Sequence, residues 1–388
     1  MVVLHSCPIW LPPTQVWLYN QIRALPQDIE SHIACIGLSA ATRFPLPNIH
    51  SLGGDSPLFY RVEAALRNLG WPIQPHWLRL LARRHDVALL HSHFGNMGWL
   101  NLPVARSRHL PHVVTFYGLD VDHLPQQDKR WSARYLELFA QTDAVLCEGP
   151  HMAARIVARG CPAAKVHVHH LGVDTAAIPF RPRRHDPSSP LRVLIAGAFR
   201  EKKGIPLALA ALGRLRAKVQ LEVTIIGDAG TEPRERLEKQ RIQAALGEHG
   251  LTASTHLLGF QPHETMMAHA YQHHIFISPS LHAADGDSEG GAPVSITEMA
   301  ASGMPVVSTR HCDIPEVIGN GLAAQLLAPE KDVDALTERL FWLVDHQEAW
   351  PELTLEVRRR IECEFDMAAQ GGRLAQLYRS LIARGRTT

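Results

Sequence analysis

The sequence predicts an α/β protein built from two Rossmann-like, doubly wound domains that face each other across a cleft. Short apolar runs alternate with longer runs of helical period along the whole chain, which indicates βαβ units and parallel sheets. Runs such as VALL (87–90) and TIIG (224–227) are apolar on both faces, as in strands that helices cover on both sides. The length of 388 residues also exceeds that of one ordinary core.

Strands and helices are predicted in the same alternating order in both halves of the chain. The predicted strands of the first half are Val2–Ser6, His32–Gly37, Val87–His93, Val113–Gly118, Ala144–Glu148 and Val166–Leu171. The predicted strands of the second half are Arg192–Gly197, Glu222–Gly227, His256–Gly259, His274–Ser278, Pro305–Ser308 and Ala324–Leu327. Examples of the helices between them are Thr14–Leu25, Arg130–Gln141, Ile205–Ala217 and Asp332–Val344.

A break in this pattern separates the two halves. The stretch PFRPRRHDPSSP (179–190) is rich in proline and charge and has no strand or helix period, so we interpret it as the interdomain linker. The first domain then spans residues 1–178 and the second spans residues 191–364. The tail, residues 365–388, has the pattern of an amphipathic helix, and we expect it to pack on the first domain.

The composition is that of a globular protein without a polyanionic partner. The apolar fraction is 46% and the net charge is +1, so no strong field attracts nucleic acid. The six cysteines are scattered and form no CxxC pair, which favours a reducing cytoplasm over a disulfide framework or a zinc site. No apolar run reaches transmembrane length, and MVVLHS has the pattern of a strand rather than a signal peptide. Most of the 24 histidines are dispersed, and we predict no metal site.

Ligands of doubly wound sheets bind at the loops that follow the strands. The stretch DGDSEGGAPVSITEMAASGMPVVST (285–309) places Glu289 in a glycine-rich loop and Glu298 nine residues later in a predicted helix. Pro293 suits the first turn of that helix, and Gly303 suits its end. Backbone N–H groups at a helix start favour a phosphate, while two nearby carboxylates suit sugar hydroxyls. The pattern therefore indicates a nucleotide-sugar as the ligand.

This stretch resembles the E-x7-E region of the retaining glycosyltransferases of family 4, which have the GT-B fold. The resemblance implies that Glu289 binds hydroxyls of the transferred sugar and that Glu298 binds the ribose. It also implies that the backbone N–H groups of Gly290, Gly291 and Ala292 meet the diphosphate. The spacing here is one residue longer than in the family, and the extra residue falls in the glycine segment. The alternative is an exposed loop glutamate followed by a solvated helical glutamate.

A second resemblance lies in LIAGAFREKKGIP (194–206). It is similar to the family's G-R-x-x-x-K-K-G pattern, whose arginine and lysine neutralise the departing diphosphate. Lys203 matches the lysine, but Ala198 stands at the arginine position, and Arg200 is the candidate substitute. The alternative for both cations is a solvated basic turn.

Two shorter segments match the family in the same order along the chain. TIIGDAG (224–230) is similar to the strand-end loop near the nucleotide, and HLLGFQPHE (256–264) is similar to the loop whose backbone reads the base. The residues that these matches assign to the nucleotide are Gly227, Asp228, Phe260, Gln261 and Pro262.

The first half resembles the acceptor side of the family in LLHSHFG (89–95) and VVTFYGLDVD (113–122). Tyr117 stands where many relatives carry a histidine that touches the donor sugar, and a tyrosine is no base near neutral pH. His93 follows a neighbouring strand and either takes part in the reaction or packs at the strand end. Asp120 either orients an acceptor hydroxyl or caps a helix.

The resemblance implies a retaining hexosyltransferase that uses a nucleotide-diphosphate sugar and a glycan or lipid-linked acceptor, and the sequence leaves the donor base open between UDP, GDP and ADP. The opening LPPTQVWLYNQIRAL (11–25) is similar to the subset that builds bacterial exopolysaccharides of the colanic-acid type. Because no general base is evident, we expect same-face attack in which the departing diphosphate accepts the proton. The triplet DGD (285–287) is a metal motif only in another glycosyltransferase fold, and here Lys203 already offsets the charge, so no metal cofactor is expected.

The segment Tyr60–Asp86 combines five arginines with two tryptophans and several leucines. Such a basic and apolar stretch suits peripheral contact with an anionic membrane surface. The alternative is a pair of helices that pack on the first sheet with their arginines outside. We expect a cytoplasmic protein. If this contact forms, the protein binds the inner face of the cell membrane.

Two other classes of protein stay open at this point. A non-catalytic sugar-nucleotide-binding protein would account for Tyr117 and Ala198 at positions where the family has histidine and arginine. A sugar-nucleotide epimerase or a phosphorylase shares the GT-B fold, but a pyridoxal-phosphate phosphorylase needs a Schiff-base lysine and a much longer chain. No GxGxxG follows the first strand, which argues against a dinucleotide dehydrogenase.

Overall fold

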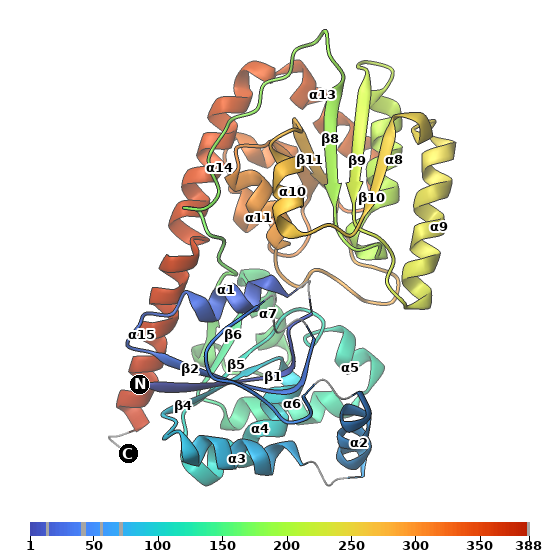
Figure 1. Cartoon of the computed structure of the whole chain (residues 1–388). Helices are drawn as coiled ribbons and strands as arrows, with labels where there is room; N and C mark the ends of the chain where they lie inside the picture. The colour runs from blue at the N-terminus through green and yellow to red at the C-terminus, as the bar shows by residue number, and fades with distance from the viewer. Residues whose placement is uncertain (13–14, 40–43, 55–56, 70–72, 386–388) are drawn as a thin grey trace. The chain divides into compact units, whose positions relative to one another are not determined.

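The computed structural model describes residues 1–12, 15–39, 44–54, 57–69 and 73–385. The chain forms two compact units (Figure 1). The first unit contains residues Met1–Gly172 together with the tail from Met367, and the second contains Val173–Asp366. Each unit is a parallel sheet with helices, as the alternating pattern predicts.

The first unit is built on a parallel sheet with the strand order β3-β2-β1-β4-β5-β6-β7. The order reverses between β1 and β4, which is the switch point of a doubly wound sheet. Here Val3 of β1 is in register with Ser31 of β2 on one side and with Leu89 of β4 on the other. The strands are β1 Val2–Trp10, β2 Glu30–Leu38, β3 Ile49–Ser51, β4 Leu89–His93, β5 His112–Thr115, β6 Ala144–Cys147 and β7 Val166–Val168.

Helices of the first unit connect these strands. Val114, Phe116 and Phe139 belong to a buried cluster between the sheet and α6, and apolar burial of this kind is the main source of stability. The helices are α1 Val16–Arg23, α2 Pro57–Asn68, α3 Gln74–Arg84, α4 Gly95–Arg108, α5 His123–Gln127, α6 Arg130–Gln141, α7 Pro150–Ala158, the short η1 Ala163–Lys165 and the final α15 Met367–Gly385.

The last helix, α15, completes the core of the first unit. Leu374 and Tyr378 are buried in one cluster with Val3 and Leu89. The Tyr378 hydroxyl also lies 2.6 Å from Nδ1 of the buried His91. Figure 1 shows this helix beside the sheet that contains the N-terminus. The chain therefore begins and ends in the same unit.

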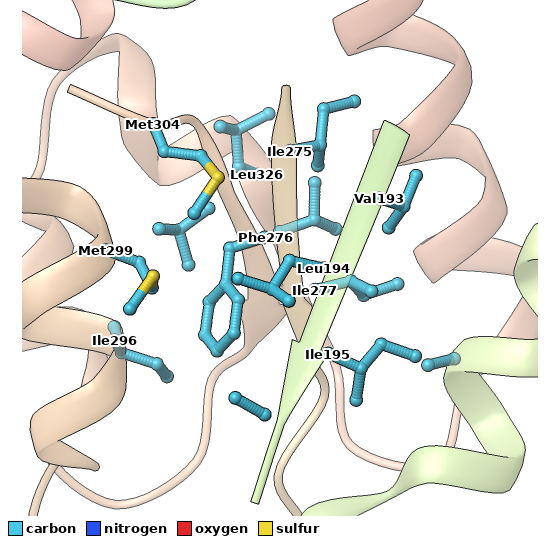
Figure 2. Close-up of a cluster of buried hydrophobic side chains, with 14 of the residues drawn as sticks. Val193, Leu194, Ile195, Ile275, Phe276, Ile277, Ile296, Met299, Met304 and Leu326 are labelled. Atoms are coloured by element: carbon cyan, nitrogen blue, oxygen red, sulfur yellow. The ribbon is translucent and has the colours of Figure 1, made fainter. Parts of the chain in front are cut away.

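The second unit contains a parallel sheet with the order β10-β9-β8-β11-β12-β13, which reverses between β8 and β11. Val193 and Leu194 of β8 are in register with Ile275 and Phe276 of β11. Figure 2 shows these side chains in a cluster with Met299 of α11. The strands are β8 Leu191–Ala196, β9 Leu221–Ile226, β10 Thr255–Gly259, β11 Ile275–Ser278, β12 Val306–Thr309 and β13 Leu327–Ala328.

The helices of the second unit lie against this sheet and against one another, α8 with α13 and α11 with α14. The α-helices are α8 Ile205–Leu215, α9 Pro233–Glu248, α10 His263–Ala270, α11 Val294–Ala301, α12 Ile314–Ile318, α13 Val333–Asp345 and α14 Trp350–Glu364. The 3₁₀ helices are η2 Glu201–Lys203, η3 Thr252–Ser254, η4 Leu322–Leu326 and η5 Gln347–Ala349.

The division between the units differs from the predicted one. It falls between Gly172 and Val173, whereas the sequence suggested a linker at 179–190. The stretch 179–190 instead packs on the second unit, where the N–H of Arg181 donates to Ser302 O at 2.9 Å. A Cβ on Gly303 would lie 2.7 Å from the Arg181 carbonyl carbon, so this glycine permits the close contact. The proline-rich composition of residues 179–190 correctly indicated a segment without helix or strand, but it did not show that the segment packs on the second unit.

Some predicted element bounds also need correction. The strand predicted at Ala324–Leu327 is mostly the 3₁₀ helix η4, and only Leu327–Ala328 forms β13. The sequence reading missed β3, whose three residues are too few to show a period. The helix predicted from Thr14 begins at Val16 in the structure, and Thr14 itself lies outside the described residues.

The segment Tyr60–Asp86 forms most of α2 and all of α3. Leu78 and Leu81 are buried against the sheet, and Trp77 packs on the same cluster. Trp71 lies outside the described residues. The exposed large apolar side chains on and beside these helices are Leu58, Val62, Leu69, Ile73 and Leu80. Within the part of the chain that the structure describes, none of the helices combines the length and apolar character needed to cross a bilayer.

Candidate active site

The loops that follow β8, β9 and β11 approach one another closely because two glycines allow it. Gly204 follows η2 with φ +61°, and a Cβ there would lie 2.1 Å from the Pro279 carbonyl oxygen. Gly227 follows β9 with φ +137°, and a Cβ there would lie 1.9 Å from Gly197 O. A side chain at either position would force the backbones apart. The sequence-predicted residues of the second unit lie on these loops and on the neighbouring ones.

Glu289 is held in a buried, charged environment. Its side chain is only 6% exposed, and Oε1 lies 2.9 Å from Lys203 Nζ. The hydroxyl of Ser280 donates to the same oxygen at 2.9 Å, and Lys202 Nζ lies 3.7 Å from Oε2. Burial alone would raise the pKa of Glu289, but Lys203 and Lys202 outweigh it and lower the pKa to about 2. The carboxylate is therefore ionised throughout the neutral range.

Arg200 forms an ion pair with the buried carboxylate of Asp287. Lys202 Nζ lies 3.3 Å from Asp287 and donates to Ser288 O at 2.7 Å. The Nε of Arg200 is buried and has no hydrogen-bond partner among the residues that the structure describes. Arg200, Lys202 and Lys203 thus supply three positive charges against the two carboxylates of Asp287 and Glu289. The excess positive charge suits an anionic ligand.

His311 connects the Glu289 loop to the next strand-end loop. It is fully buried after β12, and its Nδ1 donates to Oε1 of Glu330 at 2.8 Å. Its Nε2 accepts the backbone N–H of Glu289 at 3.1 Å. Burial lowers the pKa of His311 despite the opposing effect of Glu330, so the ring is neutral at pH 7. His282 donates its backbone N–H to Glu330 at 2.8 Å and holds this carboxylate in place.

The helix after the glycine segment begins as the sequence predicts. Pro293 is the N-cap residue of α11, and the helix ends before Gly303, which has φ +85°. Gly290 has φ +77°, a conformation that side chains disfavour. Gly290 and Gly291 are buried, and Ala292 is half-buried. Backbone N–H groups at the start of α11 are available in principle for an anion, as at other helix N-termini.

Glu298 lies on α11 with its side chain 9% exposed. Its Oε1 lies 2.7 Å from Nε2 of His263, the first residue of α10. Pro262 is the N-cap residue of α10, and Phe260 is 56% exposed in the loop before it. Gln261 donates its side-chain amide to Leu258 O. The loop assigned to the base thus lies next to the residue that contacts Glu298.

The carboxylate of Asp228, just after β9, already has partners within the second unit. Its Oδ1 lies 2.7 Å from Lys239 Nζ and accepts the Ala229 N–H at 2.7 Å. Lys239 is the largest cause of the lowered pKa of Asp228. The backbone carbonyl of Asp228 accepts the N–H of Phe199 at 2.9 Å, which joins the loops after β8 and β9.

The candidate residues of the first unit form a separate hydrogen-bonded chain. Nδ1 of His93 lies 2.7 Å from the Tyr117 hydroxyl, and its Nε2 lies 3.1 Å from Nδ1 of His5. Burial is the main cause that lowers the pKa of His93 well below its usual value and raises that of Tyr117 well above. The hydroxyl of Tyr117 also lies 3.4 Å from Oε1 of Gln21 on α1. Both candidate groups are therefore neutral at pH 7, and the lowered pKa makes the His93 ring a weaker base than a free imidazole.

Asp120 performs the capping role that the sequence left open. Its Oδ2 accepts the N–H of Gly95, the first residue of α4, at 2.6 Å, and its Oδ1 accepts the Tyr117 N–H at 2.8 Å. Phe94 is the N-cap residue and makes no side-chain cap of its own. Burial raises the pKa of Asp120 to about 6. A direct contact of Asp120 with an acceptor stays a prediction.

Sequence reasoning missed several residues that the structure brings to Glu289 and Glu298. They are Lys202, Ser280, His263, His311 and Glu330. Lys202 stands beside Lys203, and the other residues follow or begin elements next to strand ends. In the sequence, these residues could be identified only by their position after predicted strands. They are separated along the chain from the two glutamates, so no local pattern indicates the contacts.

Comparison with known sequences connects both units to glycosyltransferases. Residues 14–177 match the family described as Glycosyltransferase Family 4, and residues 190–346 match that described as Glycosyl transferases group 1. The chain is 32% identical over 301 residues to the amylovoran biosynthesis glycosyltransferase AmsK of Erwinia amylovora, covering 76% of this chain and 70% of AmsK. It is 31% identical over 306 residues to WcaL of Escherichia coli, named as a colanic acid biosynthesis glycosyltransferase, covering 77% and 71%.

Comparison with solved structures addresses the fold. The Anabaena protein Alr3699/HepE, solved in complex with UDP and glucose, matches with a TM-score of 0.78 at 15% identity and covers 98% of this chain and 100% of its own. The sucrose-phosphate synthase of Thermosynechococcus elongatus matches with a TM-score of 0.74 at 19% identity, covering 99% and 100%. These matches define a protein of the GT-B fold.

The fold of the chain is that of a GT-B glycosyltransferase. With the family matches of both units and the identity to AmsK and WcaL, the chain belongs to glycosyltransferase family 4. It is a transferase, as the resemblance implied.

Proposed function

We propose that this glycosyltransferase moves a hexose from a nucleotide-diphosphate sugar to a hydroxyl of a glycan or lipid-linked acceptor in exopolysaccharide synthesis, with retention of configuration. The observation that carries the proposal is the buried, ionised Glu289 held by Lys203 and Ser280 ahead of the start of α11. An ionised carboxylate accepts strong hydrogen bonds from sugar hydroxyls. The names of AmsK and WcaL support the polymer class, and the ligands of HepE support UDP and a hexose.

The positive charges on the loops after β8 and β11 support the proposal that this site stabilises the departing diphosphate. When the bond between sugar and diphosphate breaks, negative charge grows on the diphosphate, and fixed cations lower that barrier. Lys203 and Arg200 are our candidates for this role. Arg200 keeps a buried Nε–H without a hydrogen-bond partner among the described residues, so its guanidinium is not fully committed to Asp287. The N–H groups of Gly290, Gly291 and Ala292 would complete the diphosphate site.

Retention follows from the lack of a suitable base among the aligned residues. The lowered pKa of His93 makes it a weak base, and the phenol of Tyr117 stays protonated. The carboxylate of Asp120 accepts the N–H groups of Gly95 and Tyr117. An inverting enzyme needs a group that takes the acceptor's proton. We therefore infer same-face attack, in which the departing diphosphate oxygen accepts that proton. The reaction would need no metal, since Lys203, Arg200 and the α11 N-terminus offset the charge.

The test is a panel of UDP-, GDP- and ADP-hexoses incubated with the protein and a lipid-linked glycan acceptor. We expect release of one nucleoside diphosphate and an equal amount of elongated acceptor. Binding without release would favour a non-catalytic sugar-nucleotide-binding protein, and a changed sugar on an intact nucleotide would favour an epimerase. Proton NMR of the product then reports the anomeric configuration, and inversion would contradict the proposed mechanism.

Peripheral membrane contact would bring the enzyme to a lipid-linked acceptor. Leu58, Leu69 and Leu80 on and beside α2 and α3 are 67–72% exposed, and Arg61 and Arg83 are exposed among them. Exposed leucines among arginines suit an anionic bilayer at the cytoplasmic face. We expect salt-sensitive sedimentation with anionic vesicles that Leu80→Asp weakens and that Leu355→Asp on α14 leaves unchanged. Equal sedimentation of both variants would exclude this surface.

A further inference from the structure

Three histidines of the first unit lie close together near the amino ends of its strands. His32 lies on β2, His50 lies on β3, and His85 follows α3. Strand alternation places Glu30 and His32 on one face, and the register pairs His50 with Ala34, which shares that face. One ring nitrogen from each histidine lies within 4.8 Å of the other two. Distant segments of the chain thus bring three metal-binding side chains together.

The rings are close enough for a common ligand and open enough to reach it. His32 Nδ1 lies 3.0 Å from His50 Nε2. The ring of His85 lies 4.2 Å from that of His32 and 5.0 Å from that of His50, measured between centroids. His32 is 3% exposed, whereas His50 and His85 are half-buried. An ion can therefore enter from the side of His50 and His85.

Glu30 determines which nitrogen of His32 faces the cluster. Its Oε1 lies 3.0 Å from His32 Nε2, so Nε2–H donates to the carboxylate and Nδ1 carries the lone pair. A carboxylate that accepts the outer N–H of a histidine is the usual second partner of a metal-bound imidazole.

We propose that His32, His50 and His85 bind one Zn²⁺ ion, with water as the fourth ligand and Glu30 as the orienting carboxylate. Imidazole nitrogens are preferred ligands of Zn²⁺. Tetrahedral bonds of about 2.0–2.1 Å place ligand nitrogens about 3.3 Å apart, so small side-chain rotations bring the three nitrogens into position. The proposal does not depend on the donor-site residues, which belong to the second unit.

The position of the cluster indicates a structural role. Glu30 is the first residue of β2, so the site lies at the amino ends of the strands. The candidate residues His93, Tyr117 and Asp120 instead lie at or after carboxyl ends. A bound ion would tie the three-residue edge strand β3 and the end of α3 to β2. Binding to the folded state alone would stabilise the first unit by mass action.

Two other groups of metal-binding side chains that each lie within one unit are weaker candidates. The buried His5, His91 and His93 engage hydroxyls and one another, including Tyr378 and Tyr117. In the group of His282, His311 and Glu330, Nδ1 of both histidines lies within hydrogen-bond distance of Glu330, and Nε2 of His311 accepts the Glu289 N–H. In the His32 group, the carboxylate of Glu30 orients one ligand histidine and is not itself one of the three ligands.

The experiment is a Zn²⁺ titration of the full-length protein without an affinity tag, after removal of metal with a chelator. A chromophoric chelator competes for the ion, and atomic emission reports the metal content. We expect one tight Zn²⁺ per chain, lost in His50→Gln and in His85→Gln. Glu30→Gln should weaken binding about 10–100-fold, the usual effect of removing an orienting partner. His76→Gln, an exposed histidine on α3, is the matched control and should bind as the wild type does.

Two further readouts keep the result decisive. Zn²⁺ should raise the melting temperature of the wild type and of His76→Gln but not of His85→Gln, and Co²⁺ in its place should give the intense visible bands of a tetrahedral site. If His50→Gln fails to fold by circular dichroism, His85→Gln and Glu30→Gln decide the matter. Unchanged Zn²⁺ affinity in those two variants, or loss of the ion in His282→Gln, would overturn the proposal.

Discussion

The backbone N–H of Glu289 donates to Nε2 of His311 at 3.1 Å, while Nδ1 of the same ring donates to Glu330. This neutral histidine therefore fixes the backbone of the glutamate that we assign to the transferred sugar. His311 lies on a neighbouring strand-end loop and acts through the backbone of Glu289, not through its carboxylate. His311 is thus a positioning residue under the proposed function.

The first prediction concerns this hydrogen bond. His311→Ala should lower kcat about 10–100-fold and leave the Kd of the nucleoside diphosphate nearly unchanged, because only the glutamate loop loses its partner. His311→Gln, whose amide oxygen can accept the same N–H, should recover part of the rate. Steady-state kinetics and calorimetry measure the two quantities, and His346→Ala on a remote helix end is the control. Equal loss of nucleotide affinity would contradict a role through Glu289.

The second prediction separates the two glutamates. Glu298→Ala should weaken binding of the free nucleoside diphosphate, because this residue is assigned to the ribose. Glu289→Gln should leave that binding nearly intact and abolish transfer, because it is assigned to the sugar. His263→Ala should resemble Glu298→Ala, since its ring contacts that carboxylate. The assignment fails if both glutamate variants weaken the bare nucleotide equally by calorimetry.

The third prediction concerns Lys203 and separates catalysis from stability. Lys203→Ala should lower kcat by about 10²-fold or more, the scale of one electrostatic donor. It also leaves the buried Glu289 carboxylate without its closest cation, which typically costs about 3–5 kcal/mol of stability. The double variant Lys203→Met with Glu289→Gln should regain stability and stay inactive. Arg200→Ala should also be slow, and a nearly wild-type rate would show that another group serves the leaving diphosphate.

The fourth prediction follows from the pKa of Glu289. Its value of about 2 in the folded state lies below the ordinary 4.5, so the unfolded state binds more protons between these two values. The stabilisation, roughly 3 kcal/mol, is present above pH 4.5 and is lost as the pH falls toward 2. The free energy of unfolding, measured by urea denaturation and by hydrogen exchange of β8 and β11, should depend less steeply on pH in Glu289→Gln than in the wild type. The exposed Glu352→Gln should keep the wild-type slope, and identical slopes in both variants would refute the prediction.

The fifth prediction tests the close approach of the loops. Gly204→Ala should destabilise the second unit by about 1–3 kcal/mol, because its φ of +61° is unfavourable and its Cβ would meet Pro279 O. Gly247→Ala on α9 should instead stabilise by about 0.5–1 kcal/mol, since a Cβ there meets nothing within 4 Å. Thermal unfolding of the two variants gives opposite signs if the argument holds. A neutral Gly204→Ala would mean that the loops can separate freely.

The strand and helix pattern was determined by the sequence itself. Apolar runs predicted the strands of both sheets within a few residues, apart from β3 and β13, because burial on both faces requires them. The glycine and proline positions also predicted the start of α11 at Pro293 and its end at Gly303, since both depend on local backbone conformation. The family resemblance then aligned Glu289, Glu298 and Lys203 with known roles.

The partners of those residues were decided only by the tertiary structure. Lys203 lies 86 residues from Glu289, and His311 lies 22 residues from it, so no local period connects them. Their contacts arise because parallel strands bring their carboxyl-end loops to one edge of the sheet. His32, His50 and His85 are also dispersed along the chain and adjacent in space, because the register of β2 with β3 brings His32 and His50 together. A sequence specifies local conformation and burial directly, whereas the pairing of distant side chains depends on strand order and register.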